Sequence, residues 1–275
     1  MRHRGFRFLP CSVPTLTYKV YGSPLGLRPY IRRNMDRRSF LALLGSGTLG
    51  ATISHLTPLS AHGSSVRIIR ELPKSDVKRV AWTVDDGTSI EAVKRYIRLV
   101  ADNDLRLTFF VYSAMGSWIA NRKELQPLVN SGQIQLANHT AHHPALAGLG
   151  TKQIQKELMG AHNFIERNFG VDMRPYYRPP YGSINAKVVN AAAEIGYTKP
   201  MLWSGSLVDA SNISASRILF HARNSFYDRS IVLAHANNLT STKVFKPMLK
   251  LISDRELNLV TLNDVYETDG VADGQ

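Results

Sequence analysis

The stretch Val80-Ala81-Trp82-Thr83-Val84-Asp85-Asp86-Gly87 joins a short, mostly apolar run to two adjacent carboxylates. A run of this length that ends at turn-forming residues is typical of a buried strand. Further along, His139-Thr140-Ala141-His142-His143 follows a second apolar run, residues 134–137, in the same way. The sequence therefore places chemically reactive side chains directly after two predicted strands.

Short apolar runs of this kind alternate with amphipathic stretches through the body of the chain. The predicted strands are residues 80–84, 107–111, 134–137, 175–177, 201–204, 231–234 and 257–262. The predicted helices cover residues 90–100, 123–129, 151–169, 186–195, 214–222 and 242–253, the first after a capping box that begins at Thr88. This alternation predicts an α/β fold with a parallel sheet, and closure into a barrel would bring the carboxyl ends of the strands to one face.

The positive charge of the chain is concentrated near its N-terminus. Residues 1–61 hold nine Lys and Arg against the single acid Asp36, which leaves +5 of the net charge of +13 for residues 62–275. A charge of this size is typical of a solvated, mildly basic surface. No run of Lys and Arg interleaves with aromatic residues in the body, so nothing indicates a nucleic-acid partner.

The N-terminal region has the features of an export signal. Residues 36–41 read Asp-Arg-Arg-Ser-Phe-Leu and precede a short apolar stretch, residues 41–53, which together resemble a twin-arginine signal. The alternative is a short buried helix. Because a membrane span needs about 20 apolar residues, we expect no stable span in the mature protein.

We therefore predict three segments. Residues 1–34 form a non-structured extension, residues 35–61 form the signal peptide, and residues 62–275 form a single domain. The expected location is the periplasm, the cell wall or the medium. Cys11 is the only cysteine, so the chain cannot form an internal disulfide or a thiolate metal site.

The two stretches that follow strands have the composition of a metal site. Two imidazoles and one carboxylate leave open positions on a divalent ion, as a catalytic site requires. His139 and His143 are four residues apart and can lie on one side of a tight loop, with His142 as the competing ligand. Successive side chains of a strand point to opposite faces, so one aspartate can bind the ion while the other faces the water. An ordinary Asp-Gly turn is the alternative.

Five motifs resemble, in order and spacing, those of the polysaccharide deacetylases, the NodB-like carbohydrate esterases of family 4. They are residues 83–87, residues 139–143, residues 178–182, Trp203 with Asp209, and residues 233–235. The resemblance extends from about Val77 to Val265. It implies a distorted (β/α)7 barrel and metal-dependent removal of N-acetyl, sometimes O-acetyl, groups from sugars.

The resemblance also implies roles for single residues. The general base would be Asp85, oriented by Arg178, and the general acid would be His235, tuned by Asp209. The metal ligands would be Asp86, His139 and His143. Zinc is the expected ion, with Co2+, Ni2+ and Fe2+ as alternatives. The substrate would be bound by Pro180, Tyr181, Trp203 and Leu233.

The fourth motif departs from the family pattern. Family members often carry an acid three residues after the tryptophan and a second tryptophan after the later aspartate, where this chain has Ser206 and Ala210. The sequence therefore leaves open how the pKa of His235 is tuned and what shape the sugar subsite has. In the first motif Val84 replaces the usual phenylalanine, which is a harmless apolar exchange, and these departures leave the metal ligands in place.

Together these features predict an exported, metal-dependent deacetylase whose partner is an acetylated glycan such as a chitin-like polymer or peptidoglycan. A non-catalytic carbohydrate-binding protein of the same fold and a hydrolase of a small non-sugar amide are the alternatives. Two histidines and one carboxylate also occur in non-haem iron oxygenases, but the strand–helix alternation argues against that class. The sequence leaves the polymer and the oligomeric state open.

Overall fold

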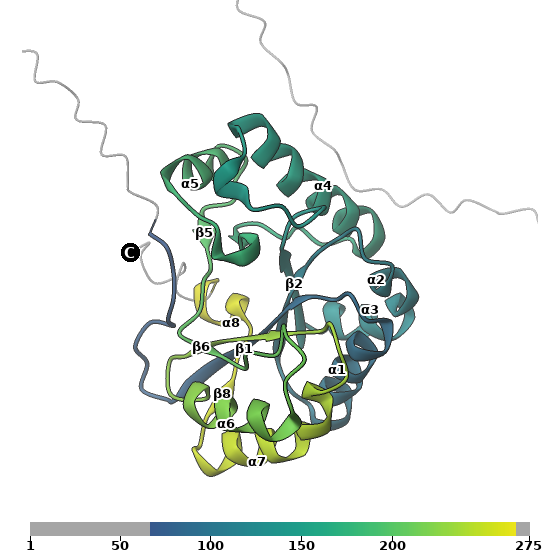
Figure 1. Ribbon diagram of the computed structural model, residues 1–275, viewed down its shortest axis with the longest axis vertical. Coiled ribbons are helices and arrows are strands. Elements are labelled where there is room, and N and C mark those ends of the chain that lie inside the picture. Colours follow the sequence, from purple (N-terminus) through teal and green to yellow (C-terminus); the bar gives the residue numbers. More distant parts are fainter. Residues whose placement is uncertain (1–66, 268–275) are drawn as a thin grey trace, which may run out of the picture. The chain divides into compact units, whose positions relative to one another are not determined.

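A parallel sheet curved into a barrel forms the centre of residues 67–267, the part of the chain that the computed structural model describes (Figure 1). The extension predicted over residues 1–34 and the signal predicted over residues 35–61 lie outside this part. None of the helices within residues 67–267 has the length and apolar character needed to cross a membrane.

The strands are hydrogen-bonded in the order β5-β4-β3-β2-β1-β7-β6, every pair is parallel, and β8 pairs with β1. Their bounds are β1 Arg79–Asp86, β2 Leu107–Val111, β3 Ile134–Asn138, β4 Tyr176–Tyr177, β5 Lys199–Pro200, β6 Gly205–Ser206, β7 Ile231–His235 and β8 Asn258–Leu259. This arrangement confirms the predicted distorted barrel of parallel strands.

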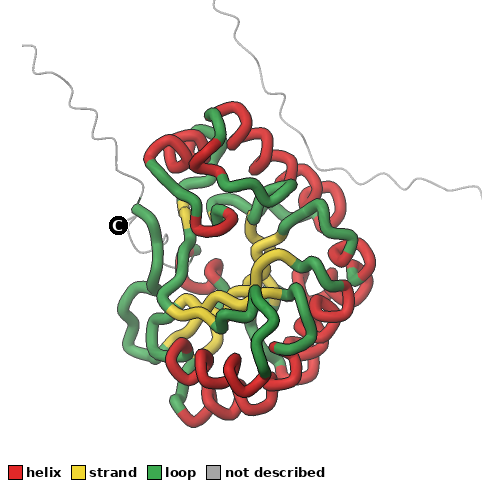
Figure 2. Tube along the Cα trace, viewed as in Figure 1, coloured by secondary structure: helices red, strands yellow, loops and turns green. Residues whose placement is uncertain are grey.

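Helices lie outside the strands around most of the barrel (Figures 1 and 2). They are α1 Ile90–Asn103, α2 Ser117–Ala120, α3 Arg122–Asn130, α4 Thr151–Phe169, α5 Ala186–Ala193, α6 Ala215–Ser225, α7 Phe245–Asp254 and α8 Leu262–Tyr266, with short 3-10 turns at Leu146–Gly148, Pro180–Gly182 and Ser241–Val244. Beside β5 the segment from Arg67 to Lys78, blue at the left of Figure 1, runs without a helix, and its Ile69 bridges to Met201.

The two faces of β1 contact different groups of apolar residues. Val80, Trp82 and Val84 belong to the large core between the sheet and the helices, where Trp82 makes edge contacts with the rings of Tyr96 and Phe226. Ala81 belongs to a second cluster, inside the barrel. Because side chains alternate along a strand, Asp85 lies on the same side as Ala81. The sheet therefore directs Asp85 into the barrel.

The prediction of a continuous strand at residues 201–204 is wrong. The structure has a short strand on each side of this stretch, β5 paired with β4 and β6 paired with β7. The carbonyls of Met201 and Leu202 accept hydrogen bonds from the Arg178 guanidinium, at 3.2 and 3.1 Å, instead of from a neighbouring strand. Residues 199–206 thus close the barrel by pairing with a different strand at each end.

Two smaller predictions also need correction. The cap of α1 is Ser89, whose hydroxyl accepts a hydrogen bond from the Ala92 N–H, and not Thr88. Glu91 pairs with Arg95, one helical turn later, instead of completing a capping box. The strand predicted at residues 257–262 is limited to β8, because Thr261 caps α8 and ends the extended segment.

The close approach of β6 to α6 gives a test of this closure. A Cβ atom added at Gly205 would lie 2.7 Å from the Cβ atom of Ser225 and 2.8 Å from its carbonyl oxygen. Because backbone must move, we expect Gly205→Ala to lower the free energy of unfolding by about 1–3 kcal/mol. Gly148→Ala is the matched control, since no atom lies within 4 Å of its added Cβ. Equal urea midpoints for the two variants would contradict the packing described here.

Candidate active site

The carboxyl end of β1 and the loop after β3 bring three possible metal ligands together. Ligand atoms of Asp86, His139 and His143 all lie within 4.8 Å of one another. The Oδ1 atom of Asp86 is 3.3 Å from the Nε2 atom of His139 and 3.1 Å from the Nε2 atom of His143. Residues far apart in the sequence thus converge on one point at the edge of the sheet.

Both aspartates face this point, although strand alternation would separate them. Asp86 has a left-handed backbone conformation, with φ of 71°, and Gly87 follows with φ of 82°. The chain therefore leaves the extended conformation at Asp86, and the Oδ2 atom of Asp85 also lies 3.6 Å from the Nε2 atom of His139. A turn at the end of β1 places two carboxylates at one site.

The donor set of this cluster fits a divalent ion. The Oδ1 atom of Asp86 is buried and has no hydrogen-bond partner among the described residues. The Nδ1 atom of His139 donates to the Arg178 carbonyl at 2.7 Å, so its Nε2 atom carries the free lone pair toward Asp86. An ionised carboxylate and neutral imidazole nitrogens are ligands that zinc and similar metals accept.

The structure distinguishes between the two candidate histidines of the loop. The His142 side chain is 72% exposed, and its Nδ1 atom lies 3.1 Å from Glu157. The His143 side chain is 17% exposed and faces Asp86. The Thr140 hydroxyl accepts a hydrogen bond from the backbone N–H of His143 at 3.0 Å, which fixes the tight loop.

Arg178 is fully buried and makes contacts with Asp85 and with the barrel wall. Its Nη1 atom lies 2.6 Å from Asp85 Oδ1 and 2.9 Å from Thr83 Oγ1. Its guanidinium carbon is 4.0 Å from the centre of the Phe110 ring. Burial lowers the pKa of Arg178, while the charge of Asp85 opposes this shift. This ion pair fixes one oxygen of Asp85 and leaves Oδ2 facing the histidines.

On the other side of β1, His235 pairs with Asp209. The two residues at the ends of neighbouring strands, Asp85 and His235, are in register, so their side chains share a face of the sheet. The Nδ1 atom of His235 is 2.9 Å from Asp209 Oδ1, and Ser241 donates to Asp209 Oδ2 at 2.6 Å. Burial alone would lower the pKa of His235, but Asp209 and the nearby Asp85 raise it above its ordinary value. The departures at Ser206 and Ala210 thus leave this pair intact.

The four residues predicted to bind substrate occupy different places around the site. Tyr181 is 74% exposed, and the centre of its ring lies 4.7 Å from that of His143. Pro180 and Leu233 are buried, the latter in register with Thr83. Trp203 is half-buried, and its ring centre is 5.9 Å from the Arg178 guanidinium carbon. Tyr181 therefore lies at the cluster of Asp86, His139 and His143, whereas Trp203 lies on the Arg178 side.

Two residues of the site were missed by the sequence analysis. The Nδ2 atom of Asn237 donates a hydrogen bond to Asp86 Oδ2 at 2.6 Å. This bond fixes the Asp86 carboxylate through the oxygen that does not face the histidines. The ring of Tyr112 lies 5.3 Å from that of His143 at 31°, on the site face of the loop. Tyr112 follows β2 directly, so its position after a predicted strand was the available signal, whereas no spacing rule points to Asn237.

Comparison with known proteins agrees with this geometry. Residues 73–200 match the family model described as polysaccharide deacetylase. A peptidoglycan-N-acetylglucosamine deacetylase of Bacillus cereus is 23% identical over 193 residues, which are 69% of this chain and 68% of that protein. The peptidoglycan-N-acetylglucosamine deacetylase PgdA of Listeria monocytogenes is 27% identical over 209 residues, which are 74% of this chain and 42% of that protein.

The fold has solved counterparts. A carbohydrate esterase family 4 (CE4) pseudoenzyme from Bacillus anthracis superposes with a TM-score of 0.64 and 19% identity, over 73% of this chain and 69% of that chain. The chain spans about two thirds of one curated relative and less than half of the other. Family model, curated relatives and barrel fold agree, and residues 73–200 carry a polysaccharide deacetylase domain.

Proposed function

We propose that this protein is a metal-dependent hydrolase that removes acetyl groups from an acetylated glycan. The observation that carries the proposal is the convergence of Asp86, His139 and His143, in which a buried carboxylate oxygen has no hydrogen-bond partner among residues 67–267. Two pairs of a carboxylate with a basic side chain, Asp85 with Arg178 and Asp209 with His235, flank this cluster. A base and an acid held on either side of a metal site are the arrangement that amide hydrolysis needs.

In this mechanism, a divalent ion held by Asp86, His139 and His143 would lower the pKa of a water and polarise the acetyl carbonyl. Asp85 takes a proton from the attacking water, using the Oδ2 atom that Arg178 leaves free. The new C–O bond forms as the carbonyl oxygen becomes an oxyanion. The backbone N–H of Tyr181, in a turn with φ of 60°, is the proposed donor to that oxyanion.

His235 completes the reaction. Its Nδ1 atom is bonded to Asp209, so its Nε2 atom is the one available to the substrate. The raised pKa of His235 keeps a larger fraction of the imidazole protonated near neutrality. The protonated ring gives its proton to the sugar nitrogen as the C–N bond breaks. The products are acetate and a free amine.

The relatives support a cell-wall glycan as the substrate class. Both relatives described above are peptidoglycan-N-acetylglucosamine deacetylases, and we infer an N-acetylated wall glycan for this chain. Such a substrate agrees with the export signal expected at residues 35–61. Zinc is the proposed ion, because its coordination chemistry matches one carboxylate and two imidazoles.

A non-catalytic, glycan-binding role is the second candidate, since one structure of this fold is a CE4 pseudoenzyme. The site retains the Asp85–Arg178 and Asp209–His235 pairs, which catalysis requires and which glycan binding alone does not require. Buried ionic pairs such as Asp85–Arg178 are costly to maintain in a protein. Their presence beside the metal cluster favours the hydrolase.

The first prediction concerns the proposed base and acid. Asp85→Asn and His235→Asn are each expected to slow acetate release by on the order of 10²–10⁴-fold, while zinc uptake stays stoichiometric. Asp85→Asn leaves Arg178 unpaired and is expected to cost about 3–5 kcal/mol of stability, so thermal unfolding is measured beside activity. His235→Asn keeps the Asp85–Arg178 pair and separates the two effects. Acetate release from both folded variants at the wild-type rate would refute the mechanism.

The second prediction uses the two neighbouring histidines. His143→Asn is expected to lose tight zinc binding, measured by titration calorimetry on chelated protein, because one of three ligands is gone. His142→Asn is the matched control and is expected to bind zinc like the wild type, since His142 points toward Glu157. Equal zinc affinity in the two variants would place the metal elsewhere.

The third prediction concerns the pH dependence. A general acid must be protonated, so activity falls as the pH rises through the pKa of His235. Asp209 raises this pKa, and Asp209→Asn is therefore expected to move the alkaline limb of the kcat/KM profile to lower pH. Asp254→Asn, which removes an exposed carboxylate, is the charge-matched control. An alkaline limb that stays in place in Asp209→Asn would exclude His235 as the acid.

A further inference from the structure

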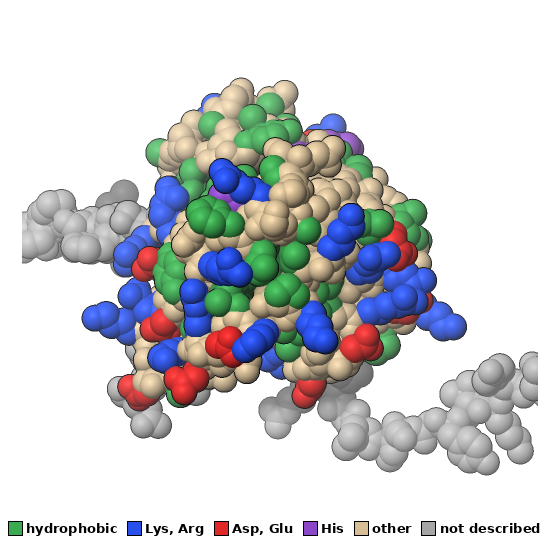
Figure 3. All heavy atoms as spheres, turned by 60° about the horizontal axis from the view of Figure 1, so that its bottom comes forward, with side chains coloured by type: hydrophobic (Ala, Val, Ile, Leu, Met, Phe, Trp, Pro, Cys, Tyr) green, Lys and Arg blue, Asp and Glu red, His purple; other side chains and the backbone are tan. Residues whose placement is uncertain are grey.

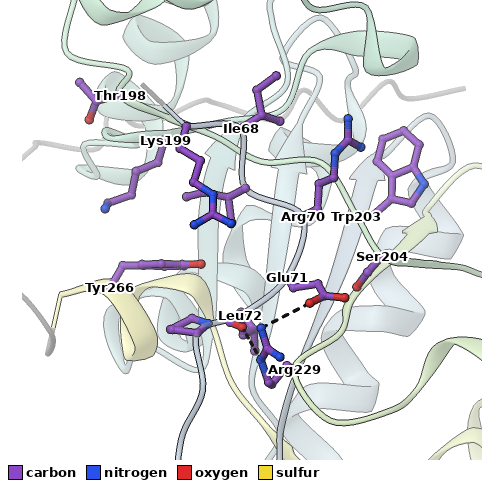
Figure 4. A pocket seen from close by; sticks show the side chains of 13 residues that line it. Ile68, Arg70, Glu71, Leu72, Thr198, Lys199, Trp203, Ser204, Arg229 and Tyr266 are labelled. Atoms are coloured by element: carbon purple, nitrogen blue, oxygen red, sulfur yellow. Dashed lines mark hydrogen bonds and ion pairs between the residues drawn. The ribbon is translucent and has the colours of Figure 1, made fainter. Parts of the chain in front are cut away.

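A pocket lies beside the closing stretch of the barrel (Figure 4), and Asp86, His139 and His143 are not among the residues that line it. Its volume is about 640 Å³, within the range of ligand sites in proteins. Three segments form it: residues 67–73, residues 198–204, and the side chains of Arg229 and Tyr266. None of the residues predicted from the sequence to act on substrate lies in it except Trp203.

The floor of this pocket is held in place by backbone hydrogen bonds. The N–H of Ile69 donates to the Pro200 carbonyl at 2.9 Å, and the N–H of Leu202 donates to the Ile69 carbonyl at 2.7 Å. The N–H of Leu72 donates to the Arg229 carbonyl at 2.8 Å. A cavity with a fixed backbone loses little conformational freedom when a ligand binds.

The pocket concentrates positive charge. Four cationic side chains line it, against one acid: Arg67, Arg70, Lys199 and Arg229, with Glu71. Arg229 is already engaged, because it lies 3.3 Å from Glu71 and donates to the Leu72 carbonyl. The Arg70 guanidinium has no hydrogen bond or ion pair with another residue in the range 67–267.

The charges on the face shown in Figure 3 are arranged differently. On the face shown in Figure 3, Lys and Arg side chains are spread out, with acidic side chains between them. Scattered charges of this sort are screened by salt and need no ligand. The pocket instead brings several cations around one half-open volume, where their attractions for an anion add.

Aromatic rings accompany these cations. Arg70 and Trp203 project on one side of the pocket, and Lys199 and Tyr266 lie on the other (Figure 4). The Lys199 ammonium is 4.9 Å from the centre of the Tyr266 ring. A cation next to a flat apolar face suits a ring-shaped ligand with a negatively charged substituent.

Trp203 connects this pocket to the proposed active site. A Cβ atom added at Gly182 would lie 3.3 Å from the Trp203 ring, so the indole contacts the turn that carries Tyr181. The same indole forms part of the pocket wall. The Trp203 indole therefore lies between the turn that carries Tyr181 and the pocket.

We propose that this pocket is an accessory subsite for a carboxylate-bearing sugar unit of the glycan substrate, with Arg70 as the carboxylate contact and Trp203, on the same side of the pocket, as the ring platform. The inference rests on the proposed function, because it takes the ligand of the pocket to be part of the same polymer. A subsite of this kind would bind an anionic glycan more tightly than a neutral one.

Kinetics with two substrates test this assignment. We expect wild-type protein to deacetylate a peptidoglycan-derived tetrasaccharide with free carboxylates at higher kcat/KM than neutral chitotetraose. Arg70→Gln is expected to reduce this ratio about fivefold, through a higher KM for the anionic substrate. Arg98→Gln removes the same charge from an exposed position on α1 and is expected to keep the ratio. An equal effect of the two variants would overturn the assignment.

Fluorescence gives a readout that does not need catalysis. The chain has three tryptophans, and because Trp82 and Trp118 are fully buried, a ligand of the pocket reports through Trp203. In chelated wild-type protein, the anionic tetrasaccharide is expected to change the emission at lower concentration than chitotetraose. The anionic tetrasaccharide is also expected to change the emission at lower concentration than sodium acetate does.

The outcomes separate the two proposals. Equal responses to the anionic and neutral sugars would overturn the subsite, as would an acetate response as strong as that of the anionic tetrasaccharide, which indicates a small-anion site only. A selective fluorescence response without any acetate release would retain the subsite and reject the deacetylase. Acetate release without a selective fluorescence response would retain the deacetylase and reject the subsite.

Discussion

The buried contact between Arg178 and Asp85 determines both the barrel and the site. An ionised group without solvent is costly unless its partners satisfy it, and Arg178 has carboxylate, hydroxyl and carbonyl partners from two other segments of the chain. Those segments are the end of β1 and the stretch between β5 and β6, while Arg178 itself directly follows β4. The Arg178 carbonyl also accepts the proton of His139 Nδ1. One residue thus fixes the proposed base, a proposed metal ligand and the closing stretch together.

Several residues with a strained backbone lie at the same edge of the sheet. Asp86, Thr140, His143 and Tyr181 all have positive φ, between 60° and 71°, without being glycine. Such conformations persist only where the surroundings enforce them, and they are common at functional sites. Here they let short loops turn several polar side chains toward one point. The regular strands below them provide the rigid support that this strain requires.

The sequence predicted those parts of the structure that local pattern controls. Apolar runs located β1, β2, β3 and β7, because each strand is buried and bounded by turn residues. Motif order placed Asp86, His139 and His143 at one edge, since parallel strands end together. The break at residues 201–204 was not predictable, because it depends on a side chain 23 positions away that takes the strand's carbonyls. Asn237 was missed for the same reason, as its contact with Asp86 spans 151 positions.

The break in the closing strand has two consequences. A regular strand would bond its carbonyls to its neighbours and leave none for a buried guanidinium. Because residues 201–204 leave the ladder, Arg178 binds the Met201 and Leu202 carbonyls, while Ile69 pairs with Pro200 and Leu202. The contacts of Arg178 fix the proposed base, and the contacts of Ile69 build the floor of the cationic pocket. The irregularity that distorts the barrel therefore links the two places at which we propose that the glycan binds.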